Sequence, residues 1–223
     1  MTHSYPDRRS AGRELARALC RTTLPPAPLL VLALPRGGVP IAYEVAHRLH
    51  APLDVLVVRK IGMPGQSELA IGAIAQGDIV VNDSQLMPFG VSERAFQQVL
   101  QRERSELARR EHVYRAGQPA LDLRGRSVIL VDDGLATGDT MLAAVRAARA
   151  AGASYILVAA PVGSVEARAR LDREADKVFL LQAPAQFYAV GQWYQQFEQL
   201  EDSDVTGLLS RSRADLEQVN PPA

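Results

Sequence analysis

Residues 128–140, which read VILVDDGLATGDT, decide the fold. Four apolar residues open the segment, as is typical of a strand that is buried on both faces of a sheet. Asp132 and Asp133 follow directly, and a turn with two glycines and two threonines leads into a predicted helix over residues 140–151. In parallel sheets, ligands bind beyond the carboxyl ends of the strands. The segment therefore predicts a strand–turn–helix unit that presents two carboxylates where a ligand would bind.

The turn after the two carboxylates is suited to a phosphate. Consecutive backbone N–H groups in such a turn form an anion-binding nest, and the helix N-terminus adds its positive dipole end. Thr137 and Thr140 add hydroxyl donors. The carboxylates suit vicinal hydroxyls or a hydrated divalent cation, and a ribose 5-phosphate combines hydroxyls and phosphate. Two other interpretations stay open: a simple N-capped helix, and an acidic Mg²⁺ pocket of the receiver-domain kind, which leaves the threonine-rich turn unexplained.

The rest of the chain alternates between apolar strands and amphipathic helices. Strands are predicted at residues 29–34, 53–58, 155–160 and 177–181, with a further strand or hairpin over 71–75 and 79–81. Helices are predicted at residues 7–21, 39–49, 92–115 and 164–174, the first with Asp7 as its N-cap. This alternation predicts an α/β fold with a central parallel sheet flanked by helices on both faces.

Two further strand ends carry groups that suit phosphate. Residues 34–40 read LPRGGVP, where paired glycines let backbone N–H groups approach a ligand and Arg36 supplies a forked cation. Arg59 and Lys60 end the predicted strand 53–58 and could stabilise charge on pyrophosphate. A plain strand-to-helix turn and ordinary strand-end solvation are the alternatives.

Residues 61–68, which read IGMPGQSE, predict a mobile, non-helical loop because of their glycines and proline. We treat residues 66–68 as a candidate lid over the site, against the simpler interpretation of a surface loop. Residues 187–197 hold five of the twelve aromatic residues. Phe187, Trp193 and Tyr194 are candidates for stacking on a planar nucleobase, although they could equally cover the sheet edge as part of the core.

Taken together, residues 128–140 resemble the motif with which type I phosphoribosyltransferases bind phosphoribosyl pyrophosphate (PRPP), and the Pro-Arg-Gly-Gly segment resembles their pyrophosphate loop. The resemblance spans nearly the whole chain and extends to a bacterial subgroup with a Val-Gly-Gln-Trp/Tyr-Tyr signature, here within residues 187–197. It implies a type I phosphoribosyltransferase-like fold, with a core over residues 1–182 and a small C-terminal hood over residues 183–223 packed on it as a single domain.

The resemblance also implies roles for individual residues. Asp132 and Asp133 would bind the ribose hydroxyls, and Arg36, Arg59 and Lys60 would act with them in catalysis. The other expected PRPP contacts are Gly37, Gly38, Ala136, Thr137, Gly138, Asp139 and Thr140. Phe187, Trp193 and Tyr194 would contact the acceptor. The family's non-proline cis peptide bond is expected between Arg36 and Gly37.

One departure from the family bears on the acceptor. Members that act on 6-oxopurines carry an aspartate as general base at the position of Ala136, so the resemblance is closer to the adenine-type members. Asp139 is unusual beside a phosphate because two negative charges repel each other. We expect its side chain to point outward.

The implied activity is transfer of the phosphoribosyl group from PRPP to a nitrogen acceptor, a nucleobase or related compound, with release of pyrophosphate. This is a glycosyltransferase reaction of nucleotide metabolism. Mg²⁺ would arrive with PRPP and lie near Asp132 and Asp133 rather than in a dedicated protein site. A non-catalytic PRPP-binding regulator is the alternative function. A homodimer is usual in the family.

Composition excludes several partners. The 223 residues carry 25 Lys and Arg and 25 Asp and Glu, so zero net charge gives no overall attraction to nucleic acid or anionic lipid. The mixed-sign helix over residues 92–115 favours a solvated face over a nucleic-acid face. No apolar run approaches the ~20 residues of a membrane helix, and Cys20 is the only cysteine. We therefore expect a cytoplasmic protein without a membrane or nucleic-acid partner.

Overall fold

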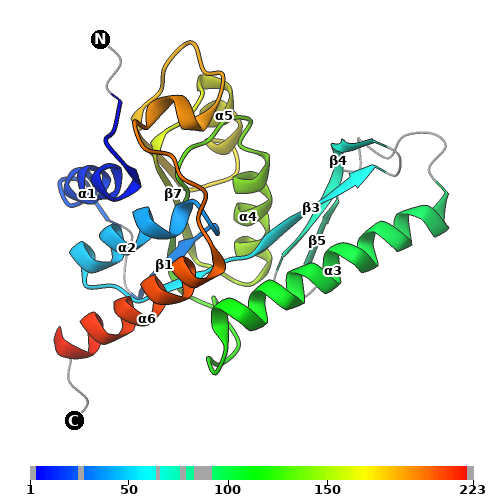
Figure 1. Ribbon diagram of the computed structural model, residues 1–223, viewed down its shortest axis with the longest axis horizontal. Coiled ribbons are helices and arrows are strands. Elements are labelled where there is room, and N and C mark those ends of the chain that lie inside the picture. Colours follow the sequence, from blue (N-terminus) through cyan, green and yellow to red (C-terminus); the bar gives the residue numbers. More distant parts are fainter. Residues whose placement is uncertain (1–3, 25–27, 64–65, 76–78, 83–91, 220–223) are drawn as a thin grey trace.

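The computed structural model describes residues 4–24, 28–63, 66–75, 79–82 and 92–219 (Figure 1). The helices are α1 (Arg8–Leu19), α2 (Gly38–Leu49), α3 (Glu93–Arg115), α4 (Asp139–Ala150), α5 (Val165–Leu171) and α6 (Asp202–Val219), with the short 3-10 helix η2 (Val190–Trp193). The strands are β1 (Leu29–Ala33), β2 (Leu53–Val55), β3 (Val58–Met63), β4 (Gln66–Ala75), β5 (Ile79–Asn82), β6 (Ser127–Val131), β7 (Tyr155–Val162) and β8 (Lys177–Gln182).

The central sheet contains five parallel strands in the order β2-β1-β6-β7-β8. Alternate residues along these strands face opposite layers of helices. Ile129 and its neighbours on that face pack with α1 and α2, whereas Leu130 and its neighbours pack with α4 and α5 (Figure 1). Since burying one such side chain contributes about 1.5–3 kcal/mol, these two cores hold the layers together. The predicted α/β architecture with helices on both faces is confirmed.

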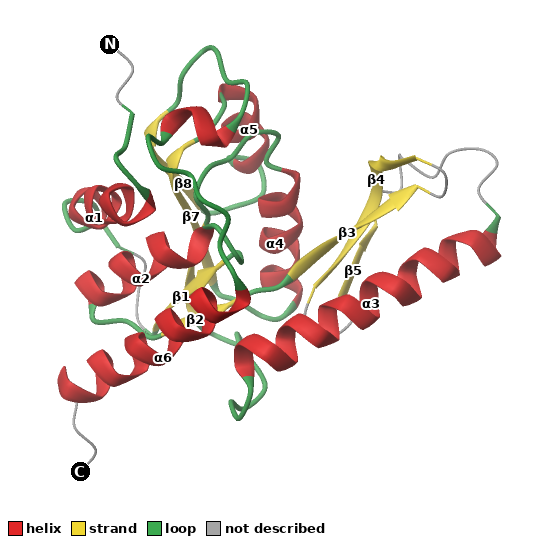
Figure 2. Ribbon diagram, in the orientation of Figure 1, coloured by secondary structure: helices red, strands yellow, loops and turns green. Residues whose placement is uncertain are grey.

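A second, antiparallel sheet has the strand order β3-β4-β5 and lies beside α3 (Figure 2). The hairpin expected over residues 71–75 and 79–81 is confirmed by β4 and β5. The prediction of one strand over residues 53–58 is wrong, because β2 ends at Val55 and β3 begins at Val58 in the other sheet. Leu56 and Val57 are buried between the two strands, so the apolar run shows no break where the chain changes sheet.

Local capping explains where several helices begin. The Asp7 side chain accepts a hydrogen bond from the Ser10 N–H at 2.6 Å, which confirms the predicted N-cap of α1. Ser164 caps α5 by accepting from the Ala167 N–H, and its hydroxyl donates to the Ala136 carbonyl at 2.7 Å. The Ser164 cap thereby joins α5 to the turn that follows β6.

The N-terminal segment pairs with residues 193–195 near the carboxyl edge of the central sheet. The Tyr5 N–H donates to the Trp193 carbonyl, and the Gln195 N–H donates to the Tyr5 carbonyl, both at 2.8 Å. Helix α6 then packs on α2 and α3, with Val205 and Leu209 buried. Among the described helices, none combines the length and the apolar character that crossing a membrane would require.

Candidate functional site

The loop after β1 and the loop after β6 interlock at the carboxyl edge of the sheet, because these two strands are neighbours. A Cβ atom on Gly37 would lie 2.0 Å from Asp133 Oδ2, and one on Gly38 would lie 2.5 Å from the Val131 carbonyl oxygen. Any side chain at either position would therefore collide with the strand end that carries the acids. Glycine is required here for the approach of one loop to the other, before any ligand is considered.

The loop after β1 contains a non-proline cis peptide bond, but between Pro35 and Arg36. The position predicted from the sequence, between Arg36 and Gly37, is wrong by one residue. Gly37 already has helical dihedral angles as the residue before α2, so the turn is complete when the chain reaches it.

Asp132 and Asp133 lie side by side in a largely dehydrated position. Asp132 Oδ1 accepts a hydrogen bond from the Asp133 N–H at 2.8 Å. Burial and the neighbouring charge of Asp133 raise the pKa of Asp132 well above its ordinary value. Burial also raises the pKa of Asp133, although a hydrogen-bonded arginine, Arg8, opposes this rise. Two acids held this close in little water can accept hydrogen bonds from vicinal hydroxyls.

The turn over residues 136–140 has the geometry of an anion site. Gly138 has a φ of +77°, in the left-handed region that favours glycine, and α4 begins at the next residue. Ala136 and Thr137 are exposed, so their side of the turn is open to a ligand. The N–H groups in the first turn of a helix lack partners within that helix, and together with the helix dipole they favour a phosphate at this place. The Asp139 N–H lies 3.4 Å from Thr137 Oγ1.

The Asp139 side chain, which we expected to point outward, is 35% exposed and is held by three partners. The Thr137 hydroxyl donates to its Oδ2 at 2.9 Å, Arg170 Nη1 lies 2.6 Å from its Oδ1, and Lys60 Nζ lies 3.5 Å from its Oδ2. Burial acts to raise the pKa of Asp139, but Arg170, Thr137 and Lys60 outweigh it and lower the pKa. The two cations offset the repulsion that this carboxylate would exert on a phosphate.

Arg59 and Lys60 lie within β3 of the second sheet, so their predicted place at a carboxyl strand end of the central sheet is wrong. Lys60 nevertheless reaches the turn after β6 through Asp139. Arg59 turns toward α3, where its Nε and Nη2 donate to Glu103 Oε2 at 3.0 and 2.6 Å. The structure thus brings Lys60 to the other predicted residues and pairs Arg59 with the buried Glu103.

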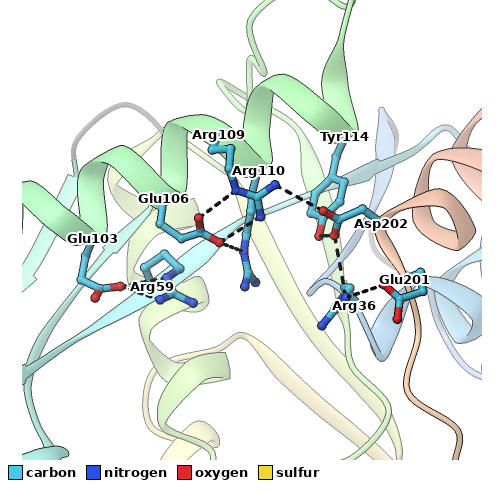
Figure 3. A network of polar contacts seen from close by, with 9 residues as sticks. All are labelled: Arg36, Arg59, Glu103, Glu106, Arg109, Arg110, Tyr114, Glu201 and Asp202. Carbon is cyan, nitrogen blue, oxygen red and sulfur yellow. Dashed lines mark hydrogen bonds and ion pairs between the residues drawn. The ribbon is translucent and has the colours of Figure 1, made fainter.

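The Arg36 side chain extends from the loop after β1 toward the C-terminal segment. Its Nη1 lies 3.8 Å from Glu201 Oε2 and 4.0 Å from Asp202 Oδ1. Figure 3 shows Asp202 also in contact with Tyr114 and Arg109 of α3. Burial and the hydrogen bond to Asp202 raise the pKa of Tyr114 to about 12. Each of the three predicted cations is therefore paired with a carboxylate from a different element.

The candidate acceptor residues are mostly core residues. Trp193 and Tyr194 are 5% and 6% exposed, and Phe187 packs on Trp193 with 5.9 Å between ring centroids. The Tyr194 hydroxyl donates to the Asp133 carbonyl at 2.5 Å, and its ring packs between Tyr5 and Phe197. These rings support the strand end that carries Asp133, and the described structure leaves little of Trp193 and Tyr194 open to an acceptor.

The sequence predictions missed Arg8, whose Nε lies 2.8 Å from Asp133 Oδ2. The sequence around Arg8 did contain a signal that this residue has a partner outside its helix. The first turn of α1 contains Arg8 and Arg9 and no acidic residue, which is the reverse of what the helix dipole favours. A cation in that place needs a partner elsewhere in the fold.

The comparisons with known proteins agree with this geometry. A family model described as a phosphoribosyl transferase domain matches residues 3–196. Two Mycobacterium tuberculosis sequences, from strains CDC 1551 and H37Rv and each named a putative phosphoribosyl transferase, are 45% identical over 212 residues. That match covers 95% of this chain and 47% of theirs, so the chain spans about half the length of these curated relatives.

The chain is also similar to the crystal structure of TT1426 from Thermus thermophilus. The two share 41% identity with a TM-score of 0.80, over 93% of this chain and 98% of that one. The central sheet and its helices therefore recur in an experimentally solved relative.

Proposed function

The chain belongs to the phosphoribosyl transferase domain family, and we propose that it transfers the phosphoribosyl group of PRPP to a nitrogen acceptor with release of pyrophosphate. One observation supports this most: Asp132 and Asp133 are interlocked with the loop of Arg36, Gly37 and Gly38 and precede an anion-binding turn. A sugar with a phosphate at one end and a pyrophosphate at the other matches that order of groups.

In the proposed complex, Asp132 and Asp133 accept hydrogen bonds from the ribose hydroxyls. Residues 136–140 bind the 5-phosphate through backbone N–H groups at the start of α4. Arg36, Arg59 and Lys60 neutralise the pyrophosphate, each exchanging a carboxylate partner for a phosphate oxygen.

The reaction breaks the bond between the anomeric carbon and pyrophosphate and forms a bond from that carbon to the acceptor nitrogen. Positive charge develops on the ribose ring, as in glycoside cleavage, so no covalent nucleophile is required from the protein. Ala136 offers no base beside the acceptor. This favours an acceptor nitrogen that attacks with its own lone pair, such as an adenine-type base or an amine.

We propose that Mg²⁺ would arrive at this site with the substrate. Within the described residues, no group of three or more metal-binding side chains comes together, and two adjacent carboxylates are too few for a protein cage. The ion would lie near Asp132 and Asp133, whose carboxylates we propose contact the ribose hydroxyls. It would supply positive charge to the leaving pyrophosphate.

We also propose that residues 183–223 form the hood over a core of residues 1–182, because this segment supplies Tyr194, Glu201 and Asp202 beside the site. Phe187 remains the most accessible of the three proposed acceptor contacts. A homodimer stays a prediction from the family, and a cytoplasmic location stays a prediction from the composition.

A PRPP-binding regulator without turnover is the second candidate. The burial of Trp193 and Tyr194 favours it, since a regulator without turnover needs no open acceptor site. The predicted loop over residues 61–68 is wrong for the described residues, because residues 61–63 belong to β3 and residues 66–68 to β4. A lid role for residues 66–68 stays a proposal that is compatible with either function.

The experiment that separates these functions is pyrophosphate release from PRPP and Mg²⁺ with a panel of nucleobases and amines. We expect turnover with at least one acceptor, an adenine-type base or an amine in preference to an oxopurine. Tight PRPP binding with no turnover on any acceptor would favour the regulator, and an absence of PRPP binding would remove both candidates.

A further inference from the structure

We propose that Arg8 is a positioning residue of this site, which fixes the Asp133 carboxylate as an acceptor for the ribose hydroxyls. The inference rests on the proposed function. It starts from the contact between Arg8 Nε and Asp133 Oδ2 at 2.8 Å, which joins residues 125 positions apart. The two side chains are 12% and 13% exposed, so little water screens the pair.

Two groups of the C-terminal segment hold the Arg8 guanidinium in place. Its Nη1 donates to the Glu198 carbonyl at 2.8 Å, and its Cζ lies 3.8 Å from the centroid of the Phe197 ring. A planar cation stacked on an aromatic face and bonded at two edges has little freedom to turn. The orientation of the Asp133 carboxylate is therefore set jointly by α1 and the C-terminal segment.

The stability of α1 does not explain the presence of Arg8. A cation in the first turn of a helix faces the positive end of the dipole and is unfavourable there. The helix already has its N-cap in Asp7, and Leu15 and Leu19 supply its buried face. The favourable contacts of Arg8 all lie outside α1, at Asp133, Phe197 and Glu198.

The charge of Arg8 matters because of the groups that surround Asp133. Asp132, from the same strand end, is the neighbouring acid, and its own pKa is raised by burial and by the charge of Asp133. Tyr194, from the C-terminal segment, donates to the Asp133 carbonyl rather than to its carboxylate. From the loop after β1, Gly37 brings no charge, and Arg36 is directed to Glu201 and Asp202. Among the described groups around Asp133, Arg8 is thus the cation that contacts its carboxylate.

The sign of the pH effect follows from this arrangement. Burial raises the pKa of Asp133 and Arg8 lowers it, so loss of Arg8 raises that pKa further. The ionised carboxylate accepts hydroxyl hydrogen bonds, and this form is lost as the pH falls through its pKa. Without Arg8, the loss of binding should therefore occur at a higher pH than in the wild type.

The chain offers a matched control for this residue. Arg9 is in the same turn of α1, is half-exposed, and places its Nε 3.1 Å from Glu44 Oε1, away from Asp133. The test is calorimetry of PRPP and Mg²⁺ with the wild type, Arg8→Met, Arg8→Lys and Arg9→Met, from about pH 6 to about pH 9. Each affinity is divided by that of the wild type at the same pH, which removes the ionisation of PRPP itself.

At pH 7 we expect the affinity of Arg8→Met for PRPP to be at least about tenfold lower than that of the wild type. At high pH this variant should regain much of its affinity. The affinity of Arg8→Lys should lie between those of Arg8→Met and the wild type. Arg9→Met should match the wild type. Should Arg8→Met fail to fold, the smaller shift of Arg8→Lys tests the same role.

Equal weakening of Arg8→Met at every pH, or none, would overturn the positioning role and leave the proposed function standing. A wild type that binds no PRPP would instead overturn the proposed function, and the role of Arg8 with it.

Discussion

The acidic and basic halves of the site are built differently. Asp132 and Asp133 lie at a strand end against which Gly37 and Gly38 fit with no room for a side chain, and Arg8 holds the Asp133 carboxylate. The cations of the basic half instead reach carboxylates on separate elements, as Figure 3 shows for Arg36 and Arg59. These ion pairs are Arg36 with Glu201 and Asp202, Arg59 with Glu103, and Lys60 with Asp139.

This difference indicates that the two halves contribute to binding in different ways. The acidic half is preorganised, so the ribose meets groups that are already in place. The basic half has to exchange its partners when pyrophosphate arrives. The ion pairs of Arg36 and Lys60 are partly exposed and contribute only about 0–1 kcal/mol each, so their exchange costs little. Glu103 is buried, but it keeps Arg102 as a second partner when Arg59 leaves it. Substitutions in the acidic half should therefore change PRPP affinity or turnover strongly. Substitutions of the carboxylates that pair with the cations should change PRPP affinity only slightly.

The largest effect is expected from Gly37→Ala. The added methyl group would overlap Asp133 Oδ2, which lies 2.0 Å from the position of that Cβ. We expect PRPP binding to fall about a hundredfold or more, with a loss of about 1–3 kcal/mol in the free energy of unfolding. Calorimetry and urea denaturation measure the two quantities.

Gly207→Ala is the control for this change. Gly207 lies within α6, and a Cβ there would meet nothing within 4 Å, so this variant should keep its affinity and gain slightly in stability. If Gly37→Ala bound PRPP as the wild type does, the interlocked loops would not be the basis of the site.

Asp133→Asn comes next. The amide removes the charge that pairs with Arg8 and replaces an acceptor by a group that also donates. We expect pyrophosphate release to fall about a hundredfold while the circular dichroism spectrum stays unchanged. Asp122→Asn, at an exposed aspartate paired with Arg124, serves as the control and should keep full turnover. Unchanged kinetics in Asp133→Asn would remove this residue from the site.

Glu103→Gln should have a smaller effect and should raise PRPP affinity rather than lower it. It weakens the hold on Arg59, whose guanidinium then becomes more available to pyrophosphate. We expect PRPP affinity to rise about threefold, while the free energy of unfolding falls by about 1 kcal/mol because Glu103 is buried. Glu106→Gln, on the same helix but paired with Arg109 and Arg110, should leave the affinity unchanged. Weaker binding by Glu103→Gln would mean that Glu103 positions Arg59 for the ligand.

Asp139→Asn should give the smallest change. It frees Lys60 and Arg170 in part and removes a negative charge beside the turn, so ribose 5-phosphate should bind about twofold to threefold more tightly. Competition with PRPP in calorimetry measures this, with Asp172→Asn as the control at an acid that pairs with Arg168. A loss of affinity would show that Asp139 orders the turn rather than opposing the phosphate.

The sequence predicted well those parts of the fold in which local pattern and packing agree. Strand β6 and the turn after it have the positions that the apolar run, the glycines and the threonines predicted. The break between β2 and β3 could not be predicted, because burial between two sheets keeps the run apolar throughout. Helix α6 was missed since its buried face rests on few apolar residues, among them Val205 and Leu209.

In the candidate site, too, local motifs could be predicted and contacts between distant segments could not. The acids and glycines could be recognised because one short segment carries each motif. The partners of the cations could not, because Glu103, Glu201 and Asp202 are brought to them by α3 and the C-terminal segment. Arg8 is 125 positions from Asp133, and only its unfavourable place in α1 hinted at a distant partner.

Titration of the chain with PRPP and Mg²⁺ in a calorimeter, beside the double variant Asp132→Asn/Asp133→Asn, tests the central claim most directly. The wild type should bind one PRPP per chain, and the double variant should show no saturable heat while keeping its fold. Equal binding by both proteins, or none by the wild type, would contradict the assignment of this strand end as the ribose site.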